Sequence, residues 1–240
     1  MGNIDLLQNI SLIVIIHIIL IDLLLSADNA VVIALACRNL DPARRQQGIV
    51  WGTLGAIVLR LALIFVALSL LSIPGLRIVG GLLLAWIAMR LLQNPEPDHT
   101  RIAGGASLLA AIKTIVVADF VMSLDNVLAI SGAVHVGMPA ASSEQQFVMV
   151  VIGLLISVPI MVLASSLVLK VLDRFPVLVL AGVGLLGWIA GGMIVTDILV
   201  LDQFGEISSL AKLAAQGAGA VAVITIGRYW AGKENAHAKP

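Results

Sequence analysis

Seven apolar stretches, each long enough to cross a lipid bilayer, exclude most soluble folds for this chain. A membrane-spanning helix needs about 20 mainly apolar residues. Hydrophobic residues form 60% of the 240 residues and charged residues only 12%, too apolar for a soluble protein of this length. We therefore predict an all-α polytopic membrane protein with seven transmembrane helices. The stretches lie at about 10–36, 48–72, 75–93, 104–134, 146–170, 175–199 and 209–230.

The distribution of Lys and Arg between the connecting segments predicts the orientation of the chain. Ten of the 14 Lys and Arg residues fall on one side of the predicted membrane and two on the other. Because cytoplasmic loops carry the excess of positive charge, we expect an outside N-terminus and a cytoplasmic C-terminus in the plasma membrane. The formal net charge is zero and no basic run is concentrated, so no nucleic-acid partner is expected.

A polar motif occurs twice within the apolar stretches. Residues 22–29 read DLLLSADN and residues 119–126 read DFVMSLDN, so both follow the pattern Asp-x-x-x-Ser-x-Asp-Asn. Residues 74–88 also parallel residues 176–190, with Pro74 opposite Pro176 and Trp86 opposite Trp188.

The two likenesses predict an internal repeat within a single transmembrane domain of residues 1–240. Repeat 1 spans about 10–93 and repeat 2 about 104–199, whereas the helix at about 209–230 and a short tail at 231–240 lie outside the repeat. Because each repeat has three spans, an odd number, the second repeat is inverted relative to the first. Inverted repeats are typical of secondary transporters, whose ion sites lie near the bilayer midplane.

The two motifs supply oxygen ligands that suit a hard divalent cation. A carboxylate at mid-membrane costs roughly 2.5 to 3.5 kcal/mol on insertion scales, so protons, water or a bound cation must offset this cost. Arg60 is one buried cation among four motif carboxylates, and we expect it to act as a counter-ion. Oxygen ligation favours Mn²⁺, Mg²⁺ or Ca²⁺ over copper or zinc. The candidate metal ligands are Asp22, Ser26, Asp28, Asn29, Asp119, Ser123, Asp125 and Asn126.

Helical geometry groups three of the four polar residues in each motif. On a continuous helix Asp22, Ser26 and Asn29 lie within about 60° of one another, whereas Asp28 lies about 120° away. All four would converge only if the helix is interrupted at the motif. Ser, Asp and Asn favour such an interruption because they cap helices. The alternative interpretation is a satisfied polar network that only holds the repeats together.

Two other features have structural interpretations. Gly187 and Gly191, like Gly48 and Gly52, have the four-residue spacing that lets helices approach closely. Asp197 falls near the outer end of the stretch at 175–199, where we expect a solvated interface residue.

The segments DLLLSADNAVVIA and DFVMSLDNVLAISG resemble the TerC family of integral membrane proteins, within the broader LysE-type exporter group. The resemblance covers nearly the whole chain. Bacterial members of similar length are manganese exporters, and others are associated with tellurium resistance. The resemblance implies that the transported ion is Mn²⁺. It also implies that the metal-handling residues are Asp22, Asp28, Asn29, Asp119, Asp125 and Asn126.

The sequence therefore predicts a secondary transporter that exports Mn²⁺ from the cytoplasm in exchange for protons. Mn²⁺ is expected as a substrate, not as a cofactor, and no enzymatic activity is expected. The alternatives are an exchanger of Ca²⁺ or another divalent cation for protons, and a metal-binding membrane scaffold subunit. A further alternative is an intramembrane aspartyl protease with Asp28 and Asp125 as a dyad. The expected partners are the ion, protons and the lipid bilayer, and the sequence is compatible with a homo-oligomer.

Overall fold

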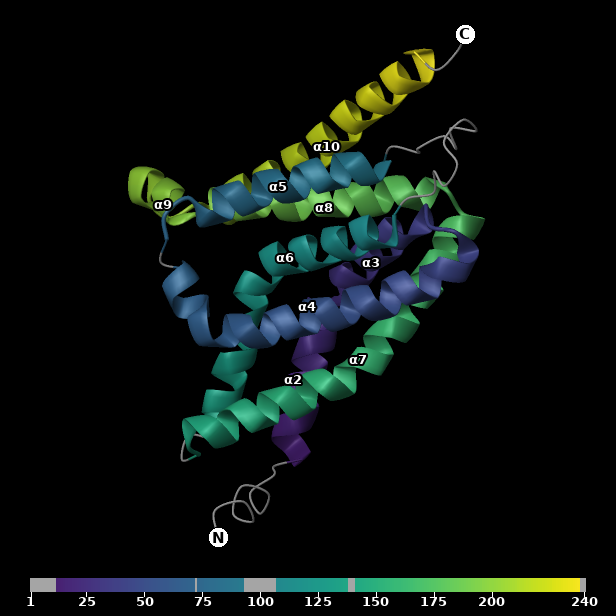
Figure 1. Ribbon diagram of the computed structural model, residues 1–240. Coiled ribbons are helices and arrows are strands. Elements are labelled where there is room, and N and C mark those ends of the chain that lie inside the picture. The colour runs from purple at the N-terminus through teal and green to yellow at the C-terminus, as the bar shows by residue number, and fades with distance from the viewer. Residues whose placement is uncertain (1–11, 72, 93–106, 138–140, 238–240) are drawn as a thin grey trace.

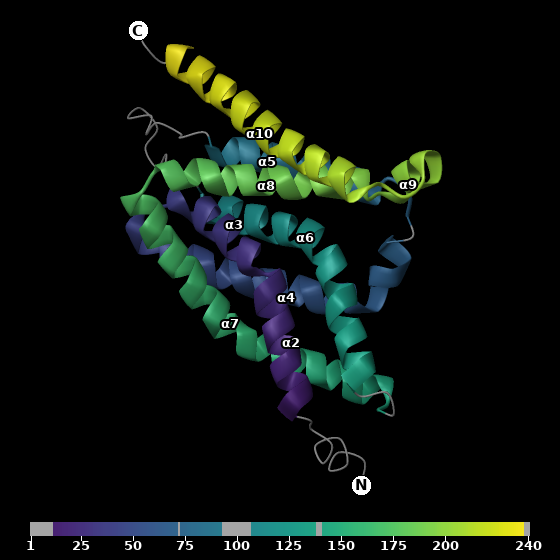
Figure 2. The same ribbon diagram turned by 180° about the vertical axis from the view of Figure 1, so that it is seen from behind.

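The computed structural model describes residues 12–71, 73–92, 107–137 and 141–237, and the regular elements in these ranges are all helices (Figures 1 and 2). Each predicted apolar stretch contains one long helix or a pair of consecutive helices. In chain order the helices are α2 (Leu12–Leu25), α3 (Ala27–Arg38), α4 (Pro42–Leu71), α5 (Leu76–Leu92), α6 (Leu108–Gly137), α7 (Ser143–Arg174), α8 (Val177–Val195), α9 (Ile198–Phe204) and α10 (Ser209–His237).

The described helices provide four or five candidate membrane spans. Four segments are long and apolar enough to cross a membrane, and α2 with α3 forms a fifth if the bent pair is one span. Helix α5 has only 17 residues, fewer than the about 20 that a bilayer needs. Helix α6 has 30 residues but contains Lys113, Asp119 and Asp125. The predicted count of seven spans therefore stays a prediction. The four segments are Pro42–Ile64, Glu144–Arg174, Val177–Val195 and Ser209–Lys233.

Several helix ends differ from the predicted boundaries for local reasons. Helix α4 begins at Pro42, earlier than the predicted residue 48, because proline is favoured in the first turn of a helix. Helix α7 begins at Ser143 after a capping box, in which Ser142 and Gln145 each accept a backbone hydrogen bond from the other. The predicted tail at 231–240 is helical as far as His237.

Helices from the two predicted repeats pack against each other. Helix α4 packs on α6 and α7, helix α3 packs on α7 and α6, and α5 packs on α8. Helix α10 covers α8 and α5, and its C-terminal part projects beyond them (Figures 1 and 2). The helices that carry the first motif, α2 and α3, thus contact α7, the second long helix of predicted repeat 2. Helix α6, which carries the second motif, contacts α4 of predicted repeat 1.

The glycine spacings mark close helix contacts, as predicted. A Cβ atom on Gly187 of α8 would lie 2.6 Å from the carbonyl oxygen of Gly219 in α10, and Gly191 lies against the same helix. A Cβ atom on Gly48 would lie 2.8 Å from Cys37 Sγ in α3, and Gly52 faces Ile115 of α6. Small residues at these positions let the backbones approach.

Asp197 is buried, so its predicted solvated position is wrong. Its side chain is 1% exposed, and its Oδ1 accepts hydrogen bonds from the backbone N–H groups of Gly75 (2.8 Å) and Leu199 (2.9 Å). Its Oδ2 accepts from the N–H groups of Arg77 (3.0 Å) and Ile78 (3.4 Å). Asp197 therefore caps the first turn of α9 and that of α5, and it joins the third helix of each predicted repeat.

Candidate ion-binding site

The first motif lies where the helix is interrupted. Helices α2 and α3 meet at Ser26 with a bend of 51°, so the interruption predicted for this motif is confirmed. The Ser26 hydroxyl makes no cap hydrogen bond to α3 and instead donates to Asp22 Oδ1 at 3.2 Å. The break therefore leaves the polar side chains of Asp22 and Ser26 available to other helices.

The second motif lies in an unbroken helix. Helix α6 runs continuously from Leu108 to Gly137, although it changes direction along its length (Figures 1 and 2). The interruption predicted for this motif is therefore absent from the helix. Ser123 Oγ donates to Asp119 Oδ2 at 3.0 Å, one turn away, in the same relation as Ser26 to Asp22. Side chains one turn apart meet on any regular helix, so this pair needs no break.

Arg60 of α4 joins the two motifs. Its Nη1 forms a salt bridge with Asp22 Oδ1 and its Nη2 forms one with Asp119 Oδ1, at 2.8 Å in the latter case. The same guanidinium donates to the hydroxyls of Ser26 at 2.9 Å and Ser123 at 3.0 Å. All five side chains are buried. One cation thus lies between two aspartate–serine pairs that come from different parts of the chain.

Two asparagines also connect the motifs. Asn29 Nδ2 donates to Asp119 Oδ1 at 2.8 Å, and Asn126 Nδ2 donates to the carbonyl oxygen of Leu25 at 3.2 Å. Each asparagine therefore reaches from its own motif to the other.

Asp28, the second aspartate of the first motif, lies apart from this cluster. Asp28 is half-buried in the first turn of α3, where its Oδ1 accepts from the backbone N–H of Asn29 at 2.9 Å. It remains close enough to Asp119 and Arg60 to interact with them electrostatically. The side chain of Asp125 lies outside the described residues. Within the described part of the chain, no three His, Cys, Asp or Glu side chains are arranged to hold a metal ion.

Ser157 of α7 belongs to the site but was not predicted from the sequence. Its hydroxyl donates to Asp22 Oδ2 at 2.5 Å, and its side chain is 2% exposed. Ser157 lies in a long apolar helix that holds other serines, so no local pattern in the sequence marked it.

A small cavity adjoins the cluster. It offers about 10 Å³ for the centre of a water molecule, about the space that one water molecule needs. Asn29 Oδ1 and Thr53 Oγ1 belong to its lining residues, and both atoms are buried without a hydrogen-bond partner among the described residues. The full lining consists of Asp22, Asn29, Ile33, Thr53, Ala56, Ile57, Arg60, Asp119, Ser157 and Met161.

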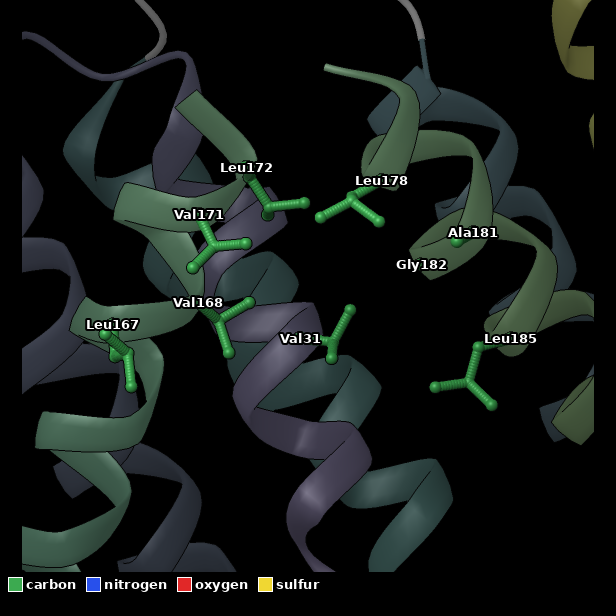
Figure 3. A pocket seen from close by; sticks show the side chains of 9 residues that line it. All are labelled: Val31, Leu167, Val168, Val171, Leu172, Leu178, Ala181, Gly182 and Leu185. Atoms are coloured by element: carbon green, nitrogen blue, oxygen red, sulfur yellow. The ribbon is translucent and has the colours of Figure 1, made fainter. Parts of the chain in front are cut away.

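A larger cavity between α3, α7 and α8 has a different character. Its volume is about 370 Å³, and the side chains that point into it in Figure 3 are all apolar. Its lining residues offer no polar side chain as a ligand for an ion, so the polar cluster is the candidate site. Its lining residues are Val31, Leu167, Val168, Val171, Leu172, Leu178, Ala181, Gly182 and Leu185.

Comparisons with known proteins identify the same family as the two motifs. Residues 7–235 match the description "Integral membrane protein TerC family". The chain is 43% identical over 204 residues to the uncharacterized membrane protein YjbE of Bacillus subtilis (strain 168), covering 84% of this chain and 88% of YjbE. It is 27% identical to the uncharacterized membrane protein YkoY of the same organism, covering 69% of this chain and 54% of YkoY.

A third uncharacterized membrane protein of that organism, YceF, is 25% identical over 182 residues, which cover 72% of this chain and 67% of YceF. No solved structure matches the chain at a significant level. The match over residues 7–235, together with the extent of the likeness to YjbE, decides the family. The chain belongs to the TerC family of integral membrane proteins.

Proposed function

We propose that this protein is a secondary transporter that exports Mn²⁺ from the cytoplasm across the plasma membrane in exchange for protons. The observation that carries the proposal is the meeting of the two duplicated motifs around the buried Arg60. Buried ionisable groups within membrane spans most often belong to ion or proton pathways. Membership of the TerC family supports a membrane function for them.

In this proposal Arg60 is the counter-ion of the site when no metal is bound. All four carboxylate oxygens of Asp22 and Asp119 already accept hydrogen bonds from Arg60, Ser26, Ser123, Ser157 or Asn29. Every one of these donors is a side chain, which can rotate away without unfolding a helix. A divalent ion would therefore take carboxylate oxygens from Arg60.

The balance of charge favours a divalent ion. Among the motif side chains that the structure describes, which exclude Asp125, three ionised carboxylates carry three negative charges and Arg60 carries one positive charge, so these four groups leave a net charge of minus two. The three carboxylates are those of Asp22, Asp28 and Asp119. One divalent cation neutralises this charge, and protonation of the carboxylates would release the ion. Exchange with protons follows from the same carboxylates because a proton and the metal compete for them.

The proposed transport cycle uses an inverted repeat with the N-terminus outside the cell. The exchange of helix contacts between the two parts of the chain supports this arrangement, since each motif helix packs on the second helix of the other part. The outer side of the protein would then hold Arg77 and Asp197. Rocking of one repeat against the other would expose the cluster to each side in turn.

Flux of metal into proteoliposomes tests the proposal. Purified full-length protein is reconstituted, and uptake of Mn²⁺, Ca²⁺ and Mg²⁺ is measured with and without an imposed pH gradient. We expect Mn²⁺ to move, its rate to respond to the gradient, and Asp22→Asn to reduce the flux below detection. Faster movement of Ca²⁺ than of Mn²⁺ would support the exchanger of another divalent cation instead.

Asp173→Asn is the matched control for Asp22→Asn. Asp173 also pairs with an arginine, Arg45, but this pair lies at the surface, with side-chain exposures of 42% and 25%. Loss of this pair should change flux and Tm little, because exposed ion pairs contribute about 0 to 1 kcal/mol to stability. A folded wild-type protein that binds Mn²⁺ and moves none of the three ions would contradict the transporter and favour a metal-binding scaffold.

A further inference from the structure

Thr53 and Met161 line the cavity beside Arg60 and lie outside both motifs, in α4 and α7. Thr53 is 2% exposed and Met161 is 8% exposed. The Thr53 hydroxyl oxygen and Asn29 Oδ1 have no hydrogen-bond partner among the described residues. A buried polar atom without a partner destabilises a fold, so two such atoms on residues that line one cavity indicate that a ligand can satisfy them.

The residues that carry the two unpartnered oxygens line the same cavity as two carboxylate residues of the polar cluster. Asp22 and Asp119 line the same cavity, which has room for about one water molecule. A bare divalent cation is no larger than a water molecule. It could therefore take Asn29 Oδ1 and Thr53 Oγ1 as ligands without breaking any existing hydrogen bond, and then draw on the carboxylates as Arg60 releases them.

Met161 adds a ligand type that the motifs lack. Of the ten residues that line this cavity, Met161 is the one with sulfur. Thioethers are soft ligands, and they favour transition-metal ions over Ca²⁺ and Mg²⁺, which prefer oxygen alone. A site of oxygen ligands with one thioether would therefore disfavour the two abundant hard cations more than it disfavours Mn²⁺.

We infer that this cavity is the subsite that receives the dehydrated ion, with Thr53 as an oxygen ligand and Met161 as the residue that selects a transition metal against Ca²⁺ and Mg²⁺. The inference rests on the proposed function for the identity of the site, and it adds two residues and the basis of selectivity. It assigns different effects to the two residues, which makes it testable. Loss of the Thr53 hydroxyl weakens the binding of every divalent ion alike, whereas loss of the Met161 sulfur changes the ratio of the affinities for different ions.

The experiment compares Met161→Leu and Thr53→Val with wild type in full-length purified protein. Met193→Leu is the matched control, because Met193 is equally buried at 8% exposed and is absent from the cavity lining. Binding is measured as the rise of Tm with added MnCl₂, CaCl₂ or MgCl₂, and transport as Mn²⁺ uptake into proteoliposomes with Ca²⁺ or Mg²⁺ as competitor. Inhibition by Cd²⁺, a softer ion, is measured in the same assay.

For Met161→Leu we expect retained Mn²⁺ uptake and a preference for Mn²⁺ over Ca²⁺ and Mg²⁺ that falls about tenfold, the effect of one specific contact. Inhibition by Cd²⁺ should weaken as well, and Met193→Leu should match wild type. For Thr53→Val we expect affinity for all three ions to fall by about tenfold or more. Its Tm without metal should not fall, because the lost hydroxyl has no hydrogen-bond partner in the described part of the chain.

Two results would overturn the inference. One is an unchanged ion preference in Met161→Leu. The other is an equal fall in the affinity of Met161→Leu for all three ions together with a lowered Tm, which would indicate a packing role. The binding measurement separates this test from that of the proposed function. A wild type that moves no metal, but shows a larger rise in Tm with MnCl₂ than with CaCl₂ or MgCl₂, would refute transport. It would still uphold the subsite if Met161→Leu keeps the rise with MnCl₂ and loses the difference between the ions.

Discussion

Two buried carboxylate sites in this protein differ in what stabilises the negative charge. Asp197 accepts four hydrogen bonds from backbone N–H groups at the first turns of α5 and α9. Asp22 and Asp119 accept only side-chain hydrogen bonds in the polar cluster around Arg60. Backbone donors at a helix end are fixed by the helix, whereas side-chain donors can rotate. The first arrangement suits a permanent structural contact, and the second suits a charge whose partner must be exchanged.

The comparison explains why burial alone does not identify a functional aspartate. Asp197 and Asp22 are both 1% exposed, although Asp22 lies in α2 and Asp197 lies just before α9. Their hydrogen-bond partners separate the two roles. The largest effects on transport should therefore come from the polar cluster, and changes at Asp197 should affect stability instead.

Substitution of Arg60 should have the largest effect. Arg60→Gln leaves two buried carboxylates without their shared cation, and breaking a buried ion pair on one side costs roughly 3 to 5 kcal/mol. We expect a large fall in Tm without metal and a larger rise in Tm with MnCl₂ than wild type shows, because the ion replaces the missing cation. Thermal unfolding in detergent with and without MnCl₂ measures both effects. An equal response to MnCl₂ in the two proteins would show that Arg60 and the ion do not compete.

Asp197→Asn should have an intermediate effect on stability. The substitution weakens charge-assisted hydrogen bonds, which contribute about 1.5 to 3 kcal/mol, and Mn²⁺ flux should continue because Asp197 lies outside the polar cluster. Burial raises the pKa of the Asp197 carboxyl, but hydrogen bonds from the N–H groups of Leu199, Gly75, Ile78 and Arg77 outweigh it, so the pKa lies below its ordinary value. Loss of flux in a folded Asp197→Asn protein would contradict the structural role.

The lowered pKa also fixes how this effect depends on pH. A carboxyl group with a lowered folded-state pKa stabilises the fold above its unfolded pKa of about 3.9. This stabilisation is lost as the pH falls through the folded-state value. The difference in Tm between wild type and Asp197→Asn should therefore be constant near neutral pH and should shrink below about pH 4. A difference that grows on acidification would contradict the assignment.

The sequence predicts part of the polar cluster because the pattern is local. Asp22, Ser26 and Asn29 share a face at helical spacing, and the structure places all three side chains in the cluster. The same spacing set Asp28 apart, and Asp28 lies at the start of α3 instead. The break at Ser26 was predictable from its residue types, whereas the continuity of α6 through the second motif was not. Both motifs have the same polar residues, so only tertiary packing can decide which helix is interrupted.

Other features required contacts between distant segments. Asp197 caps α5 through Arg77, which lies 120 residues earlier, and a residue at the end of an apolar stretch gives no local sign of such a partner. Ser157 and Thr53 are hydroxyl residues in long apolar helices, each of which holds at least one other serine. Such residues often hydrogen-bond to their own helix, as Ser165 does to Met161, so their types alone do not indicate a site.

Ser157→Ala should have the smallest effect. It allows two buried serines of α7, Ser157 and Ser165, to be compared directly. Ser157 supplies one of the side-chain hydrogen bonds to Asp22, and a single hydrogen bond contributes about 1 kcal/mol. We expect a small fall in Tm and a severalfold change in the rate of Mn²⁺ flux, because Asp22 Oδ2 loses its donor. Ser165→Ala is the control, since Ser165 is equally buried in α7 but bonds only to its own helix. Equal effects of the two substitutions on flux would show that the hydrogen bond from Ser157 to Asp22 only stabilises the fold. It would then have no influence on how Asp22 exchanges Arg60 for the metal ion.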